Sequence, residues 1–102
     1  MDAYILNTEN NPVPKDILEA VKWKRENPAL SRIGWDEVDG VTISTVFLVI
    51  DDAFLGDPKL FETCLFYGEN GDGDSRVVDR YSTFDEAKIG HNQWIKKIRD
   101  GE

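Results

Sequence analysis

The stretch from Val41 to Asp51, VTISTVFLVID, places the strongest constraint on the fold. It is rich in β-branched and aromatic residues, which favour strands. The dipeptide Asp39-Gly40 before it is typical of a two-residue hairpin turn, because aspartate and glycine accept the positive φ angles that such a turn requires. We therefore expect a β-hairpin of Arg32 to Val38 and Val41 to Asp51, followed by another strand over Leu60 to Tyr67.

Weaker signals outline the rest of the chain. Tyr4 to Leu6 is expected to form a short first strand, and Arg76 to Tyr81 a short late one. A first helix is expected to open at Pro14, because proline at the first helical position costs no hydrogen bond, and to end at Asn27-Pro28. The apolar stripe of this helix consists of Ile17, Ala20, Val21 and the stem of Lys24.

The best-defined helix is the last one. Thr83 and Glu86 have the spacing of a capping box, in which each residue satisfies a free N–H group of the first turn. Apolar and aromatic residues then repeat at intervals of three and four. We expect one α+β domain over residues 1–102, with a mainly antiparallel sheet of four to five strands and two helices packed on one face.

Composition limits the compartment and the class of protein. At 102 residues the chain is long enough to fold around a core without disulfides or a metal. The single cysteine, Cys64, has no partner for an internal disulfide and favours a reducing cytoplasm. The N-terminus has no basic, apolar leader, and no apolar run approaches the roughly 20 residues of a membrane span. We expect a cytoplasmic protein that does not contact a membrane.

Charge is concentrated in the middle of the chain. The formal net charge is −8, and residues 36–86 carry thirteen acids and three bases. Such a surface repels nucleic acid, because phosphate binding depends on Lys and Arg that displace counterions. It suits a basic protein partner, or the basic groove of a nucleic-acid enzyme. Solubility alone is the other reading of the same charge.

An acidic loop resembles a calcium site only in part. Asn70, Asp72 and Asp74 alternate like the first ligands of an EF-hand, but Ser75 stands where the glycine belongs and Tyr81 where the bidentate glutamate belongs. Its glycines do not open a helix, so they do not form a phosphate-binding loop either. We expect no metal and no cofactor.

His91 is the only histidine and therefore the ordinary candidate for proton transfer near neutral pH. It lies within the apolar stripe of the last helix, where a buried and hydrogen-bonded imidazole is the simpler interpretation. Glu62 is a candidate buried carboxylate, and Arg80 is its nearest cation by order of elements. The three could meet as a structural salt-bridge network or as a ligand pocket. Without a neighbouring nucleophile or metal spacing, we expect no enzyme.

Two tryptophans are candidate anchors for a partner. Trp35 is followed by Asp36, Glu37 and Asp39, which combines an aromatic group with an acidic rim as interfaces often do. Trp23 lies away from the stripe of its helix and needs a cover, either from this chain or from a partner. Ordinary core packing is the alternative for both.

Several short motifs occur in an order that resembles a group of small bacteriophage and prophage proteins. They are YIL near the start, PVP, VTISTVFL, LFET and RYSTFDEAKIGH. The resemblance spans nearly the whole chain and implies a location in the cytoplasm of a bacterial host. It carries no established activity, but it implies a set of residues of interest: Ser44, Thr45, Glu62, Arg80, Tyr81, Ser82, Thr83 and His91.

Two functions are expected from these observations. In the first, implied mainly by the resemblance and the charge, the chain is a non-enzymatic accessory protein that binds and blocks a host protein, such as a defence or nucleic-acid enzyme. In the alternative, a homo-oligomer sequesters a nucleotide signal, because a capped helix N-terminus suits phosphate. The residues of that pocket are Glu62, Arg80, Ser82, Thr83 and His91.

Overall fold

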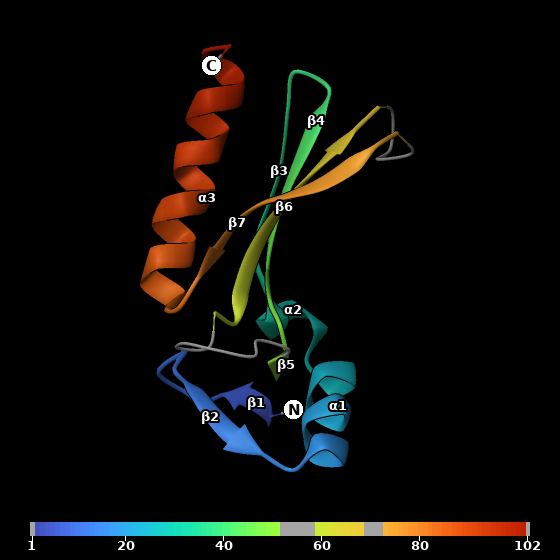
Figure 1. Cartoon of the computed structure of the whole chain (residues 1–102), viewed down its shortest axis with the longest axis vertical. Coiled ribbons are helices and arrows are strands. Elements are labelled where there is room, and N and C mark those ends of the chain that lie inside the picture. Colours follow the sequence, from blue (N-terminus) through green and yellow to red (C-terminus); the bar gives the residue numbers. More distant parts are fainter. Residues whose placement is uncertain (1, 52–58, 69–72, 102) are drawn as a thin grey trace.

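The computed structural model describes residues 2–51, 59–68 and 73–101, which form an α+β fold (Figure 1). The helices are α1 (Ile17–Glu26), α2 (Pro28–Ser31) and α3 (Phe84–Arg99). The strands are β1 (Asp2–Leu6), β2 (Pro12–Lys15), β3 (Arg32–Val38), β4 (Val41–Phe47), β5 (Ile50–Asp51), β6 (Phe61–Tyr67) and β7 (Ser75–Tyr81).

The larger sheet has four antiparallel strands in the order β3-β4-β6-β7. The predicted hairpin is confirmed, because β3 and β4 are joined at Asp39 (φ 50°) and Gly40 (φ 79°). Both turn residues adopt the left-handed conformation that this kind of turn requires. The β3–β4 turn lies at the end of the sheet where α3 also ends (Figure 1).

The smaller sheet has the order β2-β1-β5 and corrects two expectations. Pro14 does not open a helix but lies in β2, opposite Tyr4 of β1. Proline fits the outer strand of a sheet as well as a helix start, because neither position needs its missing N–H group. In addition, the strand expected to run from Val41 to Asp51 divides after Phe47, and its last two residues pair with β1 as β5.

Helix α1 begins at Ile17, three residues later than the proline suggests. Asp16 is its N-cap and accepts a hydrogen bond from the Leu18 N–H group at 3.2 Å. The end predicted at Asn27-Pro28 is confirmed, since Asn27 is the C-cap. The expected apolar stripe is only partly correct, because Ala20 is fully buried whereas Ile17 and Val21 are exposed.

Helix α3 packs along one face of the four-stranded sheet and contacts all four of its strands. The predicted N-cap is confirmed, because the Glu86 N–H group donates to Thr83 Oγ1 at 3.1 Å. The Glu86 carboxylate also reaches back as expected, but it accepts at 3.1 Å from the Thr83 hydroxyl in place of the Thr83 N–H group. Only α3 lies along this sheet among the described helices, whereas α1 packs mainly on β1.

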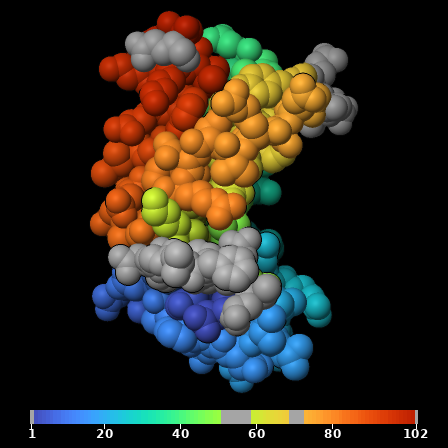
Figure 2. All heavy atoms as spheres, in the orientation of Figure 1, coloured from blue at the N-terminus to red at the C-terminus, as the bar shows by residue number. Residues whose placement is uncertain are grey.

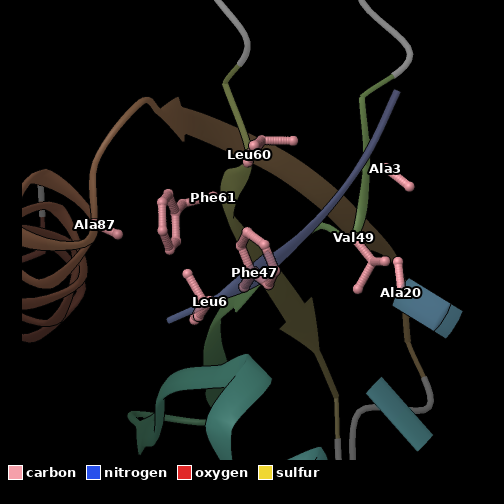
Figure 3. Close-up of a cluster of buried hydrophobic side chains, with 8 residues drawn as sticks. All are labelled: Ala3, Leu6, Ala20, Phe47, Val49, Leu60, Phe61 and Ala87. Atoms are coloured by element: carbon pink, nitrogen blue, oxygen red, sulfur yellow. The ribbon is translucent and has the colours of Figure 1, made fainter. Parts of the chain in front are cut away.

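The core joins the two sheets. Phe47 is at its centre, with Phe61 at a ring-centroid distance of 5.4 Å and Trp23 of α1 edge-on at 5.9 Å. Phe84 at the start of α3 extends the row, 6.4 Å from Phe61. One apolar cluster thus connects α1, α3 and both sheets (Figure 3), with the buried members Ala3, Leu6, Ala20, Phe47, Val49, Leu60, Phe61 and Ala87.

Candidate functional site

A chain of hydrogen bonds runs beneath α3 from one edge strand of the sheet to the other. Asp36 Oδ2 of β3 lies 2.7 Å from His91 Nε2, and His91 Nδ1 lies 2.7 Å from Thr45 Oγ1 of β4. Thr45 Oγ1 is 2.6 Å from Thr63 Oγ1 of β6, which is 3.1 Å from the Tyr81 hydroxyl of β7. We call these five residues the polar chain.

The direction of the donors in the polar chain follows from its carboxylate end. An ionised Asp36 only accepts, so His91 Nε2 carries a proton and donates it. With a neutral imidazole, Nδ1 then accepts from the Thr45 hydroxyl, Thr45 accepts from Thr63, and Thr63 accepts from Tyr81. Each buried hydroxyl therefore has both a donor and an acceptor partner.

Burial keeps the Tyr81 hydroxyl protonated at the far end of this chain. Removal from water raises the pKa of Tyr81 above its ordinary value; the Thr63 hydrogen bond lowers it, and the charge of Asp79 raises it further. At neutral pH the phenol is therefore protonated and able to donate, as the assigned direction of the polar chain requires.

Two glycines make room for the chain. A Cβ atom at Gly34 would lie 2.7 Å from His91 Nε2, so β3 can approach the imidazole only because this residue has no side chain. A Cβ at Gly90 would meet the Tyr81 ring in the same way, which allows α3 to lie close to β7. The Tyr81 ring is thus the reason that this position of α3 needs a glycine.

The polar chain contains the residue types of a hydrolase triad, but unlike such a triad it is not accessible to a substrate. Thr45 and Thr63 have no exposed surface, and His91 is 5% exposed. A substrate therefore cannot reach either hydroxyl, and both imidazole nitrogens already have partners. The expectation that His91 is a buried, hydrogen-bonded imidazole agrees with this geometry.

The opposite face of the four-stranded sheet carries a different set of side chains. We call it the open face, because no described helix lies across it (Figure 1) and the molecule is hollowed on the side away from α3 (Figure 2). Trp35 on β3 is 53% exposed and Val77 on β7 is 48% exposed. They belong to one row of cross-strand neighbours, Trp35, Ser44, Cys64 and Val77.

A β-bulge sets the order of side chains along the β3 edge of this face. The register shifts between Arg32 and Gly34, so that Arg32 opposes Val46 while Trp35 opposes Ser44. The Arg32 guanidinium lies 5.0 Å from the centre of the Trp35 ring, a cation–π contact. Glu37 follows on the same face, opposite Thr42.

Glu62 and Arg80 form the predicted ion pair, at 3.1 Å, on the open face. Glu62 Oε1 also accepts from the Cys64 thiol at 3.3 Å. Burial, with the hydrogen bond and charge of Glu62, raises the pKa of Cys64 to about 11. The thiol therefore stays protonated and weakly nucleophilic near neutral pH.

Glu62 and Arg80 do not converge with His91. Glu62 pairs with Val46 in the register, whereas Thr45 and Thr63, which bind His91, face the other side. Because neighbouring residues of a strand point to opposite faces, the sheet separates the ion pair from the imidazole.

The other two residues of the alternative pocket lie at the start of α3. The Thr83 hydroxyl is occupied by Glu86, and Ser82 lies in the bend before α3. The five residues proposed to bind a nucleotide therefore do not form one site.

The residues predicted for partner binding divide in the same way. Trp35, Glu37 and Asp39 are exposed along β3 and its turn, as an interface requires. Asp36 points to the α3 side and is engaged with His91. Trp23 is half-buried against Phe47, so its cover comes from this chain.

Sequence reasoning missed the connection of Asp36 to His91 and the part played by Thr63. The resemblance drew attention to Thr45 and Tyr81, which do belong to the polar chain. One signal was present in the sequence: Thr45 sits in an otherwise apolar strand face with Ile43 and Phe47, and a buried hydroxyl needs a polar partner.

No group of three or more histidine, cysteine, aspartate or glutamate side chains is placed to hold a metal ion within residues 2–51, 59–68 and 73–101. The calcium-like positions Asn70 and Asp72 lie outside the described residues. None of the described helices is long and apolar enough to span a membrane.

No family model, curated protein or solved structure matches this chain. Its function is therefore argued from its own residues.

Proposed function

We propose that this chain is a non-enzymatic binding domain that covers a surface of another protein with its open face. The observation that carries the proposal is Trp35, half exposed at the edge of a sheet face that no described helix covers. Tryptophan and arginine contribute most strongly to protein interfaces, and here Arg32 stacks on Trp35. An exposed apolar group of this kind, rimmed by charges, is typical of a contact surface.

Charge indicates the chemistry of the partner. The chain has a net charge of −8, and Glu37 and Asp39 lie beyond Trp35 toward the turn. A protein surface with an apolar spot beside basic side chains complements this arrangement, and electrostatic attraction would speed its approach. A host protein blocked in this way, such as a component of a defence system, is the narrower form of the proposal that the resemblance implies.

The buried position of the polar chain supports a non-enzymatic role. Its threonine hydroxyls are inaccessible and its histidine has two partners, so these groups stabilise the packing of α3 on the sheet. On the open face, the raised pKa of Cys64 removes the obvious nucleophile. The nucleotide-sequestering alternative receives no such support, because its residues lie on different sides of the sheet.

The experiment is capture of a partner by the immobilised full chain from bacterial lysate at moderate salt, followed by binding measurements with the purified partner. We expect Trp35→Ala to lower the affinity by roughly tenfold or more, as for an aromatic anchor of an interface. Ile89→Ala is the matched control, because Ile89 is 59% exposed on α3. Retention of nothing, or equal loss in both variants, would overturn the proposal.

A further inference from the structure

The β3 edge of the open face is its own complement. Along β3 this face carries a positive, an aromatic and a negative side chain in turn: Arg32, Trp35 and Glu37. Their cross-strand partners are Val46, Ser44 and Thr42, so Arg32 and Glu37 stand two register positions on either side of Trp35, or about 7 Å each way. A rotation of 180° about an axis beside Trp35 exchanges the two charges.

The β-bulge produces this symmetry. In a regular strand, Arg32 and Trp35 are three residues apart and would point to opposite faces. The extra residue between Arg32 and Gly34 restores Arg32 to the face of Trp35. The charges therefore flank the aromatic ring only because the strand is irregular at this point.

We propose that, when no other partner is bound, a second copy of this chain covers the open face, so that a partner must displace it. The two sheets stack face to face, with a two-fold axis perpendicular to the strands and beside Trp35. Arg32 of each copy then meets Glu37 of the other, and the two Trp35 rings meet at the axis. This inference rests on the proposed function only in that both use the same surface.

The charges select this arrangement over its alternative. With the two-fold axis parallel to the strands, β3 of one copy would lie over β7 of the other, and Arg32 would meet Arg80 in the corresponding register row. Arg80 is already paired with Glu62, so in that stacking Arg32 meets a second cation and gains no carboxylate of its own. The perpendicular axis instead places Arg32 against Glu37 at two symmetric positions.

The available area indicates a weak dimer. Four strands of seven residues measure about 19 Å by 24 Å, which gives a footprint of roughly 450 Å² per copy. A stable interface usually buries about 800 Å² per partner. Repulsion between two chains of charge −8 also opposes association, although salt screens it. We therefore expect a dimer that forms in the micromolar range and yields to a tighter partner.

Sedimentation equilibrium of the full chain in about 0.15 M salt, from about 5 to 500 µM, tests the inference. The wild type should pass from monomer to dimer over this range. R32E and E37R should each weaken the dimer by roughly tenfold or more, because each places like charges opposite one another. An equimolar mixture of the two variants should dimerise again, since every position then meets its opposite charge.

Controls separate this effect from net charge and from misfolding. K96E and E26R make the same changes of charge at exposed helix positions away from the open face, and they should leave the association constant within about threefold of the wild type. Recovery in the mixture itself shows that both variants are folded, and thermal unfolding of each variant alone checks this independently.

The outcomes are distinct from those of the capture experiment. A wild type that remains monomeric at about 500 µM, or a mixture that does not dimerise, would overturn the self-association. Partner capture that depends on Trp35 would still support the proposed function in that case. If the dimer shows the expected charge dependence but no partner is captured, the self-association is supported and the proposed function is overturned.

Discussion

His91 Nε2 lies 2.7 Å from Asp36 Oδ2, and this contact joins the middle of α3 to the edge strand β3. The two residues are 55 positions apart in the chain. Because Asp36 lies between Trp35 and Glu37, the same strand presents a candidate binding surface on one face and secures a helix on the other.

The proton of the neutral His91 imidazole should reside on Nε2, since Asp36 can only accept. Nitrogen chemical shifts of the imidazole, measured by NMR above pH 7, should report this tautomer, and a proton on Nδ1 would contradict the assigned direction of the polar chain. Asp36→Ala should lower the free energy of unfolding by about 1 kcal/mol, because the carboxylate is half exposed. Glu37→Gln, a change on the other face of β3, serves as the control and should have a smaller effect.

Thr63→Val should destabilise the protein by about 1–3 kcal/mol, because it leaves Thr45 without its donor and Tyr81 without its acceptor. Thr63→Ser keeps the hydroxyl and should retain most of the stability. Denaturant unfolding measures both. In a double-mutant cycle, Tyr81→Phe should cost less in the Thr63→Val background than alone, and strict additivity would argue against the Thr63–Tyr81 hydrogen bond.

Gly34→Ala should destabilise the protein by about 1–3 kcal/mol, since the added methyl group would lie 2.7 Å from His91 Nε2. Thermal or denaturant unfolding measures the loss. The same substitution combined with His91→Ala should cost less, because the smaller side chain vacates the space that the methyl group needs. An equal cost in both backgrounds would mean that backbone conformation, and not the imidazole, explains the glycine.

Gly40→Ala provides a contrast, because nothing lies within 4 Å of a Cβ atom at that position. Its cost should come from the backbone alone, since Gly40 has a φ of 79°. We expect a loss of about 1 kcal/mol in denaturant unfolding. Asp39→Asn should be tolerated, because asparagine also accepts the φ of 50° found at Asp39. A neutral Gly40→Ala would contradict the turn geometry.

Cys64 should react slowly with iodoacetamide in the folded protein. With a pKa of about 11 in place of 9.0, the thiolate fraction at pH 8 falls by roughly 100-fold, and the rate should rise with pH up to that range. Glu62→Gln removes the negative charge and leaves a weaker acceptor; because the charge and the hydrogen bond of Glu62 both raise the pKa of Cys64, the substitution should speed alkylation. A rate equal to that of the unfolded chain would show that the thiol is not shielded.

Local signals predicted those parts of the fold that depend on neighbouring residues. Asp39-Gly40 indicated the hairpin turn because its φ angles are a property of the two residues themselves. Thr83 and Glu86 indicated the start of α3 because a capping box closes within one turn. Pro14 failed as a signal, since an outer strand and a helix start both tolerate it, and only the pairing with Tyr4 decides between them.

The candidate site could be predicted only in part, because it depends on register. His91 was expected to be buried and paired, but the expected partners Glu62 and Arg80 lie on the far face of the sheet. Which face a residue occupies changes with a shift of one position, and the bulge between Arg32 and Gly34 introduces such a shift. A bulge has no clear signature in this sequence, so neither the Asp36–His91 contact nor the alignment of Arg32 with Trp35 was foreseen.

The hydrogen bonds between His91 and Tyr81 can also run in the opposite direction, from the imidazole toward the phenol. If the imidazole gains a second proton, Nδ1 becomes a donor to Thr45. The hydroxyl hydrogens of Thr45, Thr63 and Tyr81 can then each rotate to the next acceptor, and the partly exposed phenol donates its hydrogen bond to solvent. No heavy atom needs to move, and no polar group of the polar chain loses its hydrogen-bond partner. Helix α3 can therefore keep its position on the sheet in either protonation state of His91.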